Sequence, residues 1–285
     1  MQKTLTFTLN DSQVKEVFEF LKGMGVSKPN SNEYIQWYFK GSDWTASMYT
    51  SGKFVLQTSN IDLQNDLEKI LVCGKDFVAH IGSDEVGKGD YFGPLVVCSC
   101  YVDSVALEKI AGYGIMDSKK LCDEKIKTIA KALVKDLDYE VKIVHPVEYA
   151  KLMEKFKNVS IVLAKLHVEV IQKLFSRFDS EVGYVVVDQF SKSKSRLNDE
   201  FNLKIPLKQY HHAESDVAVA AASVIARYFF LLEFEKMKKR YGLNFPLGAT
   251  HVIKFGRNFV KKYGVKELEN VAKISFRTTK QIISS

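Results

Sequence analysis

Alternating apolar and polar residues predict four strands near the start of the chain. In the first of them Leu5, Phe7 and Leu9 share one face and threonines occupy the other, the pattern of a half-buried strand. The four predicted strands cover residues 3–9, 34–40, 44–50 and 53–58. Apolar stripes at helical spacing predict one helix capped at residue 11 or 12 and another over residues 61–71. This order predicts a small α+β domain, with helices covering one face of its sheet.

The other face of this predicted sheet is polar and contains tyrosines. Strand alternation places these side chains on it: Thr4, Thr6, Tyr34, Gln36, Tyr38, Lys40, Thr45, Ser47, Tyr49 and Gln57. A flat surface of this kind is suited to lie along a nucleic-acid backbone and to stack on sugars or bases. An ordinary solvated sheet face is the plainer interpretation, and the net charge of −1 over residues 1–79 favours it.

Residues 77–102 predict two strands joined by a glycine-rich turn. The first apolar run leads into Asp84 and Glu85, and the turn at residues 87–89 follows. Adjacent strand side chains point to opposite faces, so these two acids share one site only where the strand ends or twists. A dinucleotide-binding motif would need a helix directly after the glycines, and a second β-rich run follows instead.

Strands then alternate with helices. Further strands are predicted at residues 140–144, 182–187 and 203–207, and helices up to residue 135 and over residues 159–178 and 214–241. Small residues near the start of the last helix allow it to pack closely on a sheet. Two hairpin strands followed by this alternation predict a mixed sheet with helices on both faces.

The pattern therefore predicts two domains, residues 1–73 and residues 77–285, with a linker at residues 72–76 and a basic, helical region from residue 251 onward. No apolar run approaches a membrane span, and the N-terminus lacks the apolar core of a signal peptide. The four cysteines contain no Cys-x-x-Cys pair, and we interpret them as small buried hydrophobic residues. We expect a cytoplasmic monomer without a membrane-bound part.

The net charge of +7 is unevenly distributed. Residues 236–285 contain twelve bases and only two acids, Glu267 and Glu269. A basic lobe near an acidic cluster indicates a polyanion held beside a cation site, although a solvated basic face would look the same in sequence.

Acidic residues recur where predicted elements begin or end. Asp84 and Glu85 follow one strand, Asp188 ends another, and Glu214 and Asp216 lie at the start of the last long helix. Ligand sites in open α/β sheets lie at the carboxyl ends of the strands. Carboxylates without His or Cys favour hard cations, Mg²⁺ or Mn²⁺, which activate water and stabilise a leaving oxygen in phosphodiester hydrolysis. Taken alone, a solvated acid pair at a strand exit is the plainer interpretation.

Six segments in this order resemble the type 2 ribonucleases H. They are GSDEVGKGDYFGP, DSKKL, VVVDQF, AESDVAVAAASVIAR, FPLGA and ISFRTT, within residues 77–279. The DYFGP variant and the long N-terminal extension are most similar to ribonuclease HIII. The strand order of residues 1–73 and the hairpin WTASMYTSGKFVLQ resemble the substrate-binding domain of that family, which has a TATA-binding-protein-like fold.

The resemblance implies an α/β fold with an RNase H-like mixed five-stranded sheet, and hydrolysis of the RNA strand of RNA–DNA hybrids to 5′-phosphate and 3′-hydroxyl ends. Asp84, Glu85, Asp188 and Glu214 match the metal ligands of the family, and Asp216 is the alternative to Glu214. Residues matching substrate contacts are Gly87, Lys88 and Gly89 in the turn, and Lys119 and Lys120 in the DSKKL segment. Lys88 departs from the Thr or Arg expected at its position.

Two hypotheses from other functional classes remain to be distinguished. A nucleic-acid-binding module without catalysis would have broken acids, and all four are intact. A metal-dependent DNA nuclease of the same fold would lack a reader of the 2′-hydroxyl, so cleavage of pure DNA would distinguish it.

Overall fold

The computed structural model describes residues 3–29, 32–72, 77–115, 122–211, 213–249 and 251–284. The chain divides into two compact units. The N-terminal unit consists of Met1–Phe77 and Ser104–Gly114, and the C-terminal unit of Val78–Asp103 and Ile115–Ser285. The segment Ser104–Gly114 therefore groups with the N-terminal unit, whereas the sequence pattern alone places it in the second domain.

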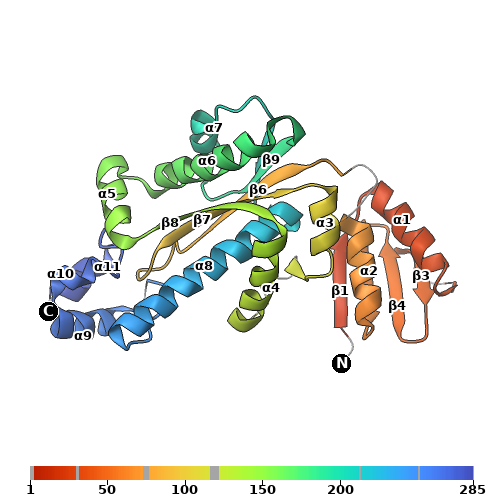
Figure 1. The fold of residues 1–285 in the computed structure, drawn as a ribbon. Coiled ribbons are helices and arrows are strands. Elements are labelled where there is room, and N and C mark those ends of the chain that lie inside the picture. Colours follow the sequence, from red (N-terminus) through yellow and green to blue (C-terminus); the bar gives the residue numbers. More distant parts are fainter. Residues whose placement is uncertain are drawn as a thin grey trace. The chain divides into compact units, whose positions relative to one another are not determined.

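The N-terminal unit is one antiparallel sheet with helices on one face (Figure 1). Its elements are β1 (Lys3–Thr8), α1 (Asp11–Lys22), β2 (Val26–Ser27), β3 (Ile35–Lys40), β4 (Trp44–Tyr49), β5 (Lys53–Thr58), α2 (Ile61–Val72) and α3 (Ser104–Ile110). The strand order is β1-β5-β4-β3-β2. Asn10, rather than Asp11 or Ser12, caps α1, because its side chain accepts from the backbone of Gln13 in a capping box. Helices and sheet share one apolar core around Phe39, Phe54 and Leu21.

The C-terminal unit is a mixed sheet between helices. Its strands are β6 (His80–Val86), β7 (Leu95–Val102), β8 (Asp138–Val144), β9 (Tyr184–Asp188) and β10 (Leu207–Tyr210). Its α-helices are α4 (Asp123–Asp136), α5 (Pro146–Phe156), α6 (Val159–Phe178), α7 (Ser195–Glu200), α8 (Val217–Tyr241), α9 (Ile253–Tyr263), α10 (Val265–Leu268) and α11 (Thr278–Ile283). The order is β10-β9-β6-β7-β8, antiparallel from β6 to β8 and parallel among β6, β9 and β10. Both predicted sheets are thus confirmed.

Two predicted elements begin three or more residues later than expected. The strand predicted at residues 203–207 begins at Leu207, since Pro206 has no N–H to donate to the ladder. The last long helix begins at Val217, because Asp216 caps it and residues Ala213–Ser215 form a separate 3₁₀ turn.

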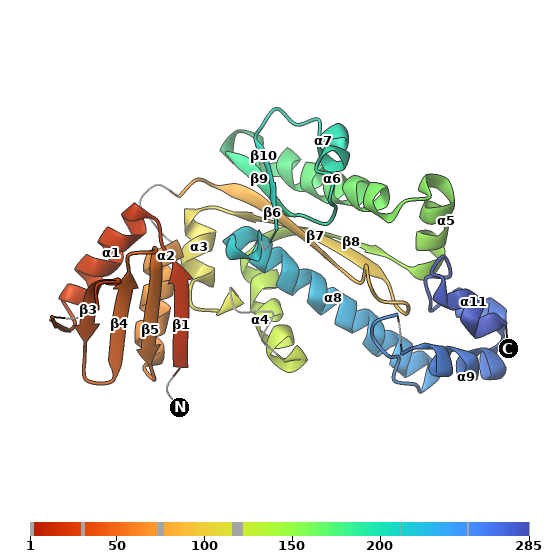
Figure 2. The ribbon, with the colours of Figure 1, turned by 180° about the vertical axis from the view of Figure 1, so that it is seen from behind.

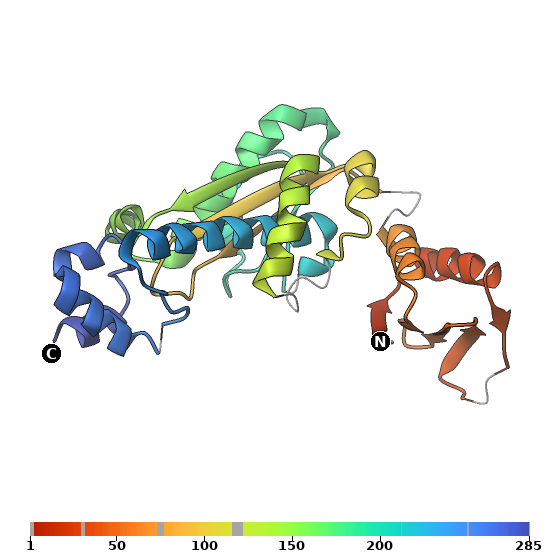
Figure 3. The same cartoon turned by 60° about the horizontal axis from the view of Figure 1, so that its bottom comes forward.

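Helices α6 and α8 cover opposite faces of the sheet (Figure 2). On β6, Ile81 packs with apolar residues of α6, whereas Gly82 faces the start of α8. Contrary to the expectation that no apolar run approaches a membrane span, α8 is long and apolar enough to span a membrane by length and composition. However, 67% of its most apolar window is buried within the protein, as in a core helix. The C-terminal helices gather at the far end of α8 (Figure 3), where Tyr241, Phe245 and Phe259 form an aromatic core.

Gly82 is the residue that permits the close approach of β6 and α8. A Cβ atom at this position would overlap the backbone of Ala218 and Val219, which cannot move without shifting the helix. We expect Gly82→Ala to lower the free energy of unfolding by about 3 kcal/mol or more, the upper range for overpacking. Chemical denaturation measures this, with Gly89→Ala as the matched control, because a Cβ at Gly89 meets no atom within 4 Å. Equal stability of the two variants would contradict the close approach.

Candidate active site

The parallel pairing of β6 and β9 brings the predicted acids together. Ser83 pairs with Val187, so Asp84 and Asp188 follow side by side at the ends of the ladder. The backbone N–H of Ala213 donates to Asp188 Oδ1 at 3.0 Å, which places the 3₁₀ turn containing Glu214 next to Asp188. The structure therefore brings Asp84, Asp188 and the turn that carries Glu214 together at the carboxyl ends of β6 and β9.

Asp84 is held in an environment that disfavours its charge. It is 8% exposed, and burial raises its pKa to about 7, with the negative charges of Glu85 and Asp188 acting in the same direction. Hydrogen bonds from the Ser223 side chain and the backbone N–H of Glu85 act against this shift. Acids that repel one another in the free protein are stabilised by a bound cation.

The raised pKa predicts a pH-dependent response to divalent cations. The protonated Asp84 carboxyl stabilises the folded protein; this contribution is full below about pH 3.8 and is lost as the pH rises through about 7. A cation must displace that proton, so Mg²⁺ should raise the melting temperature more at about pH 8 than at about pH 5. Calorimetric melting curves measure the effect, and Asp84→Asn should remove most of the difference. A shift of equal size at both pH values in the parent protein would contradict it.

Glu85 lies on the other side of β6 from Asp84. Its Oε2 is 3.2 Å from Nε2 of His167 on α6, and its Oε1 is 3.9 Å from Nζ of Lys88. The two acids thus lie on opposite faces of the strand near its last residue, Val86, and the charge of Glu85 still acts on Asp84.

The structure favours Glu214 over Asp216 as the fourth acid. Asp216 accepts from the N–H groups of Ala218 and Val219 as the cap of α8, and it contacts Nε2 of His80 at 3.0 Å. Its carboxylate is engaged in holding the helix. Glu214 is half-buried and its Oε2 is fully buried next to the Asp188 segment.

The donor set fits a hard divalent cation. Among the described residues, no three acidic, His or Cys side chains are spaced as a ready-made metal cage. The three acids that interact electrostatically, Asp84, Glu85 and Asp188, nevertheless offer only carboxylate oxygens, the ligands that Mg²⁺ and Mn²⁺ prefer.

The glycine turn after β6 is tightly constrained. Gly87 has φ +92°, a conformation that favours glycine, and a Cβ there would overlap the carbonyl of Pro94. Lys88 turns back, and its Nζ donates to the backbone carbonyl of Phe190. Gly89 is exposed, so its backbone is open to a ligand.

A buried lysine holds the segment that follows this turn. Lys273 is fully buried, and its Nζ donates to the carbonyls of Asp90 and Gly93 at 2.8 Å each. Burial lowers the pKa of Lys273 to about 7. The backbone of Lys273 also donates to Tyr91, so residues 271–273 act as a clamp on residues 90–93.

The predicted polar face of the N-terminal sheet needs one correction. Tyr38 pairs with Ser47 and Lys40 with Thr45, as alternation requires, but the register shifts between Ile35 and Trp37. Ile35 therefore lies opposite Tyr49, and Tyr34 is displaced from the face that Tyr38 and Lys40 share. The side chain of Tyr34 is 64% exposed.

Some predicted residues are not part of this geometry. Lys119 and Lys120 lie outside the described residues, as does Cys73. Cys98 and Cys100 are buried as predicted, whereas Cys122 is exposed.

Three contacts of the site could not be found from motifs. His167 and Lys273 lie outside the motif segments, and Ser223, although within AESDVAVAAASVIAR, is predicted only as a small residue that packs on the sheet. For Lys273 one weak signal exists, a lone lysine between apolar residues in VAKIS.

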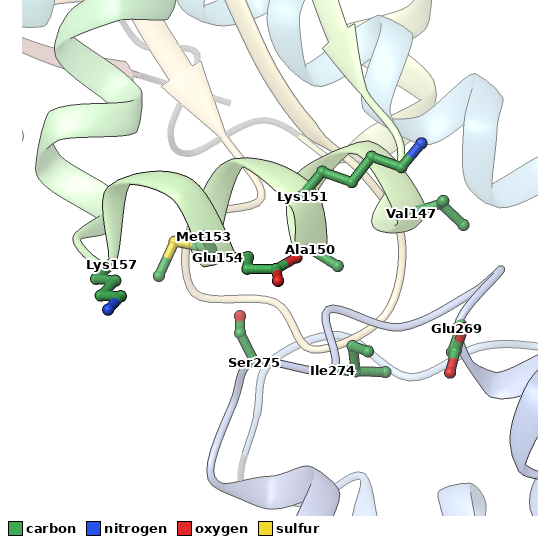
Figure 4. Close-up of a pocket in the computed structure, with 9 residues that line it drawn as sticks. All are labelled: Val147, Ala150, Lys151, Met153, Glu154, Lys157, Glu269, Ile274 and Ser275. Atoms are coloured by element: carbon green, nitrogen blue, oxygen red, sulfur yellow. The ribbon is translucent and has the colours of Figure 1, made fainter.

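A pocket of about 580 Å³ lies elsewhere, between α5 and the segment after α10 (Figure 4). Val147, Met153 and Ile274 give it apolar walls, and Glu154 points into it. None of the predicted site residues lines it, so this pocket does not mark the acidic site.

Comparison with known proteins identifies the family. Residues 81–279 match the family model of ribonuclease HII. The ribonuclease HIII of Phytoplasma mali is 34% identical over 289 residues, which cover 99% of this chain and 100% of the relative. The ribonuclease HIII of Geobacillus kaustophilus is 37% identical over 80% of this chain and 73% of its own length.

Solved structures agree with the sequence relatives. The crystal structure of Bst ribonuclease HIII in complex with Mn²⁺ has a TM-score of 0.72 at 28% identity, covering 99% of this chain and 98% of the other. Aquifex aeolicus ribonuclease H3 shares the fold, with a TM-score of 0.59 over 96% of this chain and 100% of the other, at 24% identity. This chain is a ribonuclease H and belongs to the type 2 family, among the ribonucleases HIII.

Proposed function

We propose that the enzyme cuts the RNA strand of RNA–DNA hybrids internally with two divalent cations, leaving 5′-phosphate and 3′-hydroxyl ends. The observation that carries this proposal is the alignment of β6 with β9, which sets Asp84 beside Asp188 directly before the glycine turn. Membership of the ribonuclease HIII family supports the same substrate.

The chain's own residues have separate roles in this reaction. Asp84, Glu85, Asp188 and Glu214 supply the oxygen ligands, and Asp84 gives up its proton when a cation binds. Cations bound there would activate a water molecule and stabilise the leaving oxygen. The backbone at Gly87 and Gly89 approaches the ribose, where the 2′-hydroxyl distinguishes RNA from DNA.

Either Mg²⁺ or Mn²⁺ fits these carboxylate oxygens. The Bst relative was solved with Mn²⁺. Cleavage assays with each ion alone, and with neither, establish the preference of this enzyme.

Cleavage of matched duplexes tests the proposal. An RNA–DNA hybrid, a DNA duplex of the same sequence and a DNA duplex with one ribonucleotide should be compared under equal ionic conditions. We expect cuts only in ribonucleotide-containing strands, and mapping of the ends gives the products. Equal cleavage of the DNA duplex would indicate a DNA nuclease, and binding without cleavage a non-catalytic protein.

We further propose that the polar face of the N-terminal sheet binds the hybrid. Tyr38→Ala should raise KM about fivefold, since stacking on an aromatic ring contributes about 1 kcal/mol or more, while kcat stays within about twofold. The matched control is Tyr34→Ala, which removes a more exposed tyrosine displaced from that face. Steady-state kinetics on one hybrid gives both constants, and equal effects of the two changes would contradict the proposal.

A further inference from the structure

His167 is fully buried in α6, and both nitrogens of its ring have a polar partner. Nδ1 is 2.8 Å from Oγ of Ser83, and Nε2 is 3.2 Å from Oε2 of Glu85. Ser83 and Glu85 are two residues apart on β6, so they share the strand face toward α6. The imidazole ring of His167 therefore connects Ser83, inside β6, with Glu85, a predicted metal ligand.

The hydrogen bonds around the ring determine what Nε2 does. Ser83 Oγ is also 2.8 Å from the carbonyl of Cys98, to which it donates. If Ser83 donates there, Nδ1 carries a ring proton and donates it to Ser83 Oγ. If Ser83 instead donates to Nδ1, the neutral ring has its proton on Nε2. In both arrangements Nε2 lies within hydrogen-bond distance of Glu85 Oε2, so the ring and the carboxylate hold each other in position.

The plane of the ring is fixed from a second direction. Phe190 stacks on His167 with ring centres 5.0 Å apart and an angle of 3° between the planes. Phe190 follows Asp188 by two residues, and its carbonyl accepts from Lys88. The orientation of His167 is thus coupled to the strand that carries Asp188.

Glu85 has few other contacts that would orient it. Lys88 is 3.9 Å from Oε1, and the Lys88 side chain is 36% exposed. Asp84, in contrast, accepts from the Ser223 side chain and from a backbone N–H. A histidine that only fills the core would need no carboxylate partner. His167 has one, and it is Glu85, a predicted metal ligand.

We propose that His167 is a positioning residue that orients the Glu85 carboxylate for the divalent cation. The inference rests on the proposed function, because it takes Glu85 to be a ligand. Residues that orient metal ligands through hydrogen bonds typically contribute about 10- to 100-fold in metal affinity or activity.

Two near-isosteric changes separate the two ring nitrogens. His167→Gln places an amide N–H near the position of Nε2 and keeps a donor to Glu85. His167→Asn places its amide near Nδ1, so it keeps the contact with Ser83 and loses the one with Glu85. His167→Leu removes both donors.

Calorimetric titration of the nucleic-acid-free protein with Mn²⁺ is the first measurement. We expect His167→Gln to bind within about threefold of the parent, and His167→Asn to bind about 10- to 100-fold more weakly. Cleavage should follow the same order at low Mn²⁺ and partly recover at high Mn²⁺. Melting curves show whether each variant is folded, and the Gln–Asn comparison stands even if His167→Leu does not fold.

Equal Mn²⁺ affinity of the Asn variant and the parent would overturn the inference and make His167 a core residue. Loss in the Gln and Asn variants alike would also overturn it, because the donor to Glu85 would then not matter. If the proposed function itself were wrong, a different result would show it: Asp188→Asn would then bind Mn²⁺ and cleave hybrid like the parent.

Discussion

Asp188→Asn is expected to abolish hybrid cleavage, with a loss of at least about 10³-fold in kcat, and to leave the protein folded. Removal of an anionic ligand weakens a cation site that contributes several kcal/mol to the transition state. The amide oxygen of Asn still accepts from the N–H of Ala213, so the 3₁₀ turn keeps its anchor.

Asp188→Asn is also expected to affect the stability of the metal-free protein. The charge of Asp188 is one of those that raise the pKa of Asp84, so its removal relieves repulsion at neutral pH. We expect the metal-free variant to be as stable as the parent or more so, in parallel melting and activity measurements. Substantial metal-dependent cleavage by Asp188→Asn would refute the assignment.

The same logic ranks the fourth acid. Glu214→Gln should reduce cleavage far more than Asp216→Asn, because Asn is also a good helix cap and keeps α8 in place. The reverse ranking would move the ligand to Asp216.

The second large effect is expected at Gly89. Its φ is ordinary and a Cβ there meets nothing within 4 Å, so Gly89→Ala should melt within about 1 °C of the parent. If the proposed contact with the ribose forms, cleavage of hybrid should nevertheless fall about 10²-fold, since the added methyl group would displace the sugar and small displacements of a reacting group are costly.

Gly87→Ala is the informative contrast. Its positive φ and the overlap with Pro94 predict a lower melting temperature as well as lost activity. Gly89→Ala with the kcat and KM of the parent would show that the turn does not contact the sugar. Hybrids with 2′-deoxy substitutions near the cut should show the same loss with the parent enzyme.

The sequence predicts the two sheets well because their strands alternate or are continuously apolar. The neighbouring positions of Asp84 and Asp188 follow from two apolar strands that each end in an acid, and the parallel ladder confirms them. The bulge that displaces Tyr34 has no such signal, because residues 34–40 alternate without interruption and only pairing with β4 reveals the shift.

The pattern of apolar and polar residues does not predict contacts between single residues that lie far apart in the sequence. His167 is separated from Glu85 by 82 residues and lies on a helix whose apolar stripe predicts only burial. Its ring becomes a partner of Glu85 only once α6 packs on the odd-numbered residues of β6.

The contacts of Lys273 with residues 90–93 can form only late in the synthesis of the chain. Asp90 leaves the ribosome 183 residues before Lys273, a delay of roughly 10 to 40 seconds at ordinary rates of translation. All four acids are made before Lys273. Until Lys273 follows, the carbonyls of Asp90 and Gly93 lack their donor. We expect residues 90–93 to be held in place only after Lys273 has left the ribosome, later than the strands that carry Asp84 and Asp188.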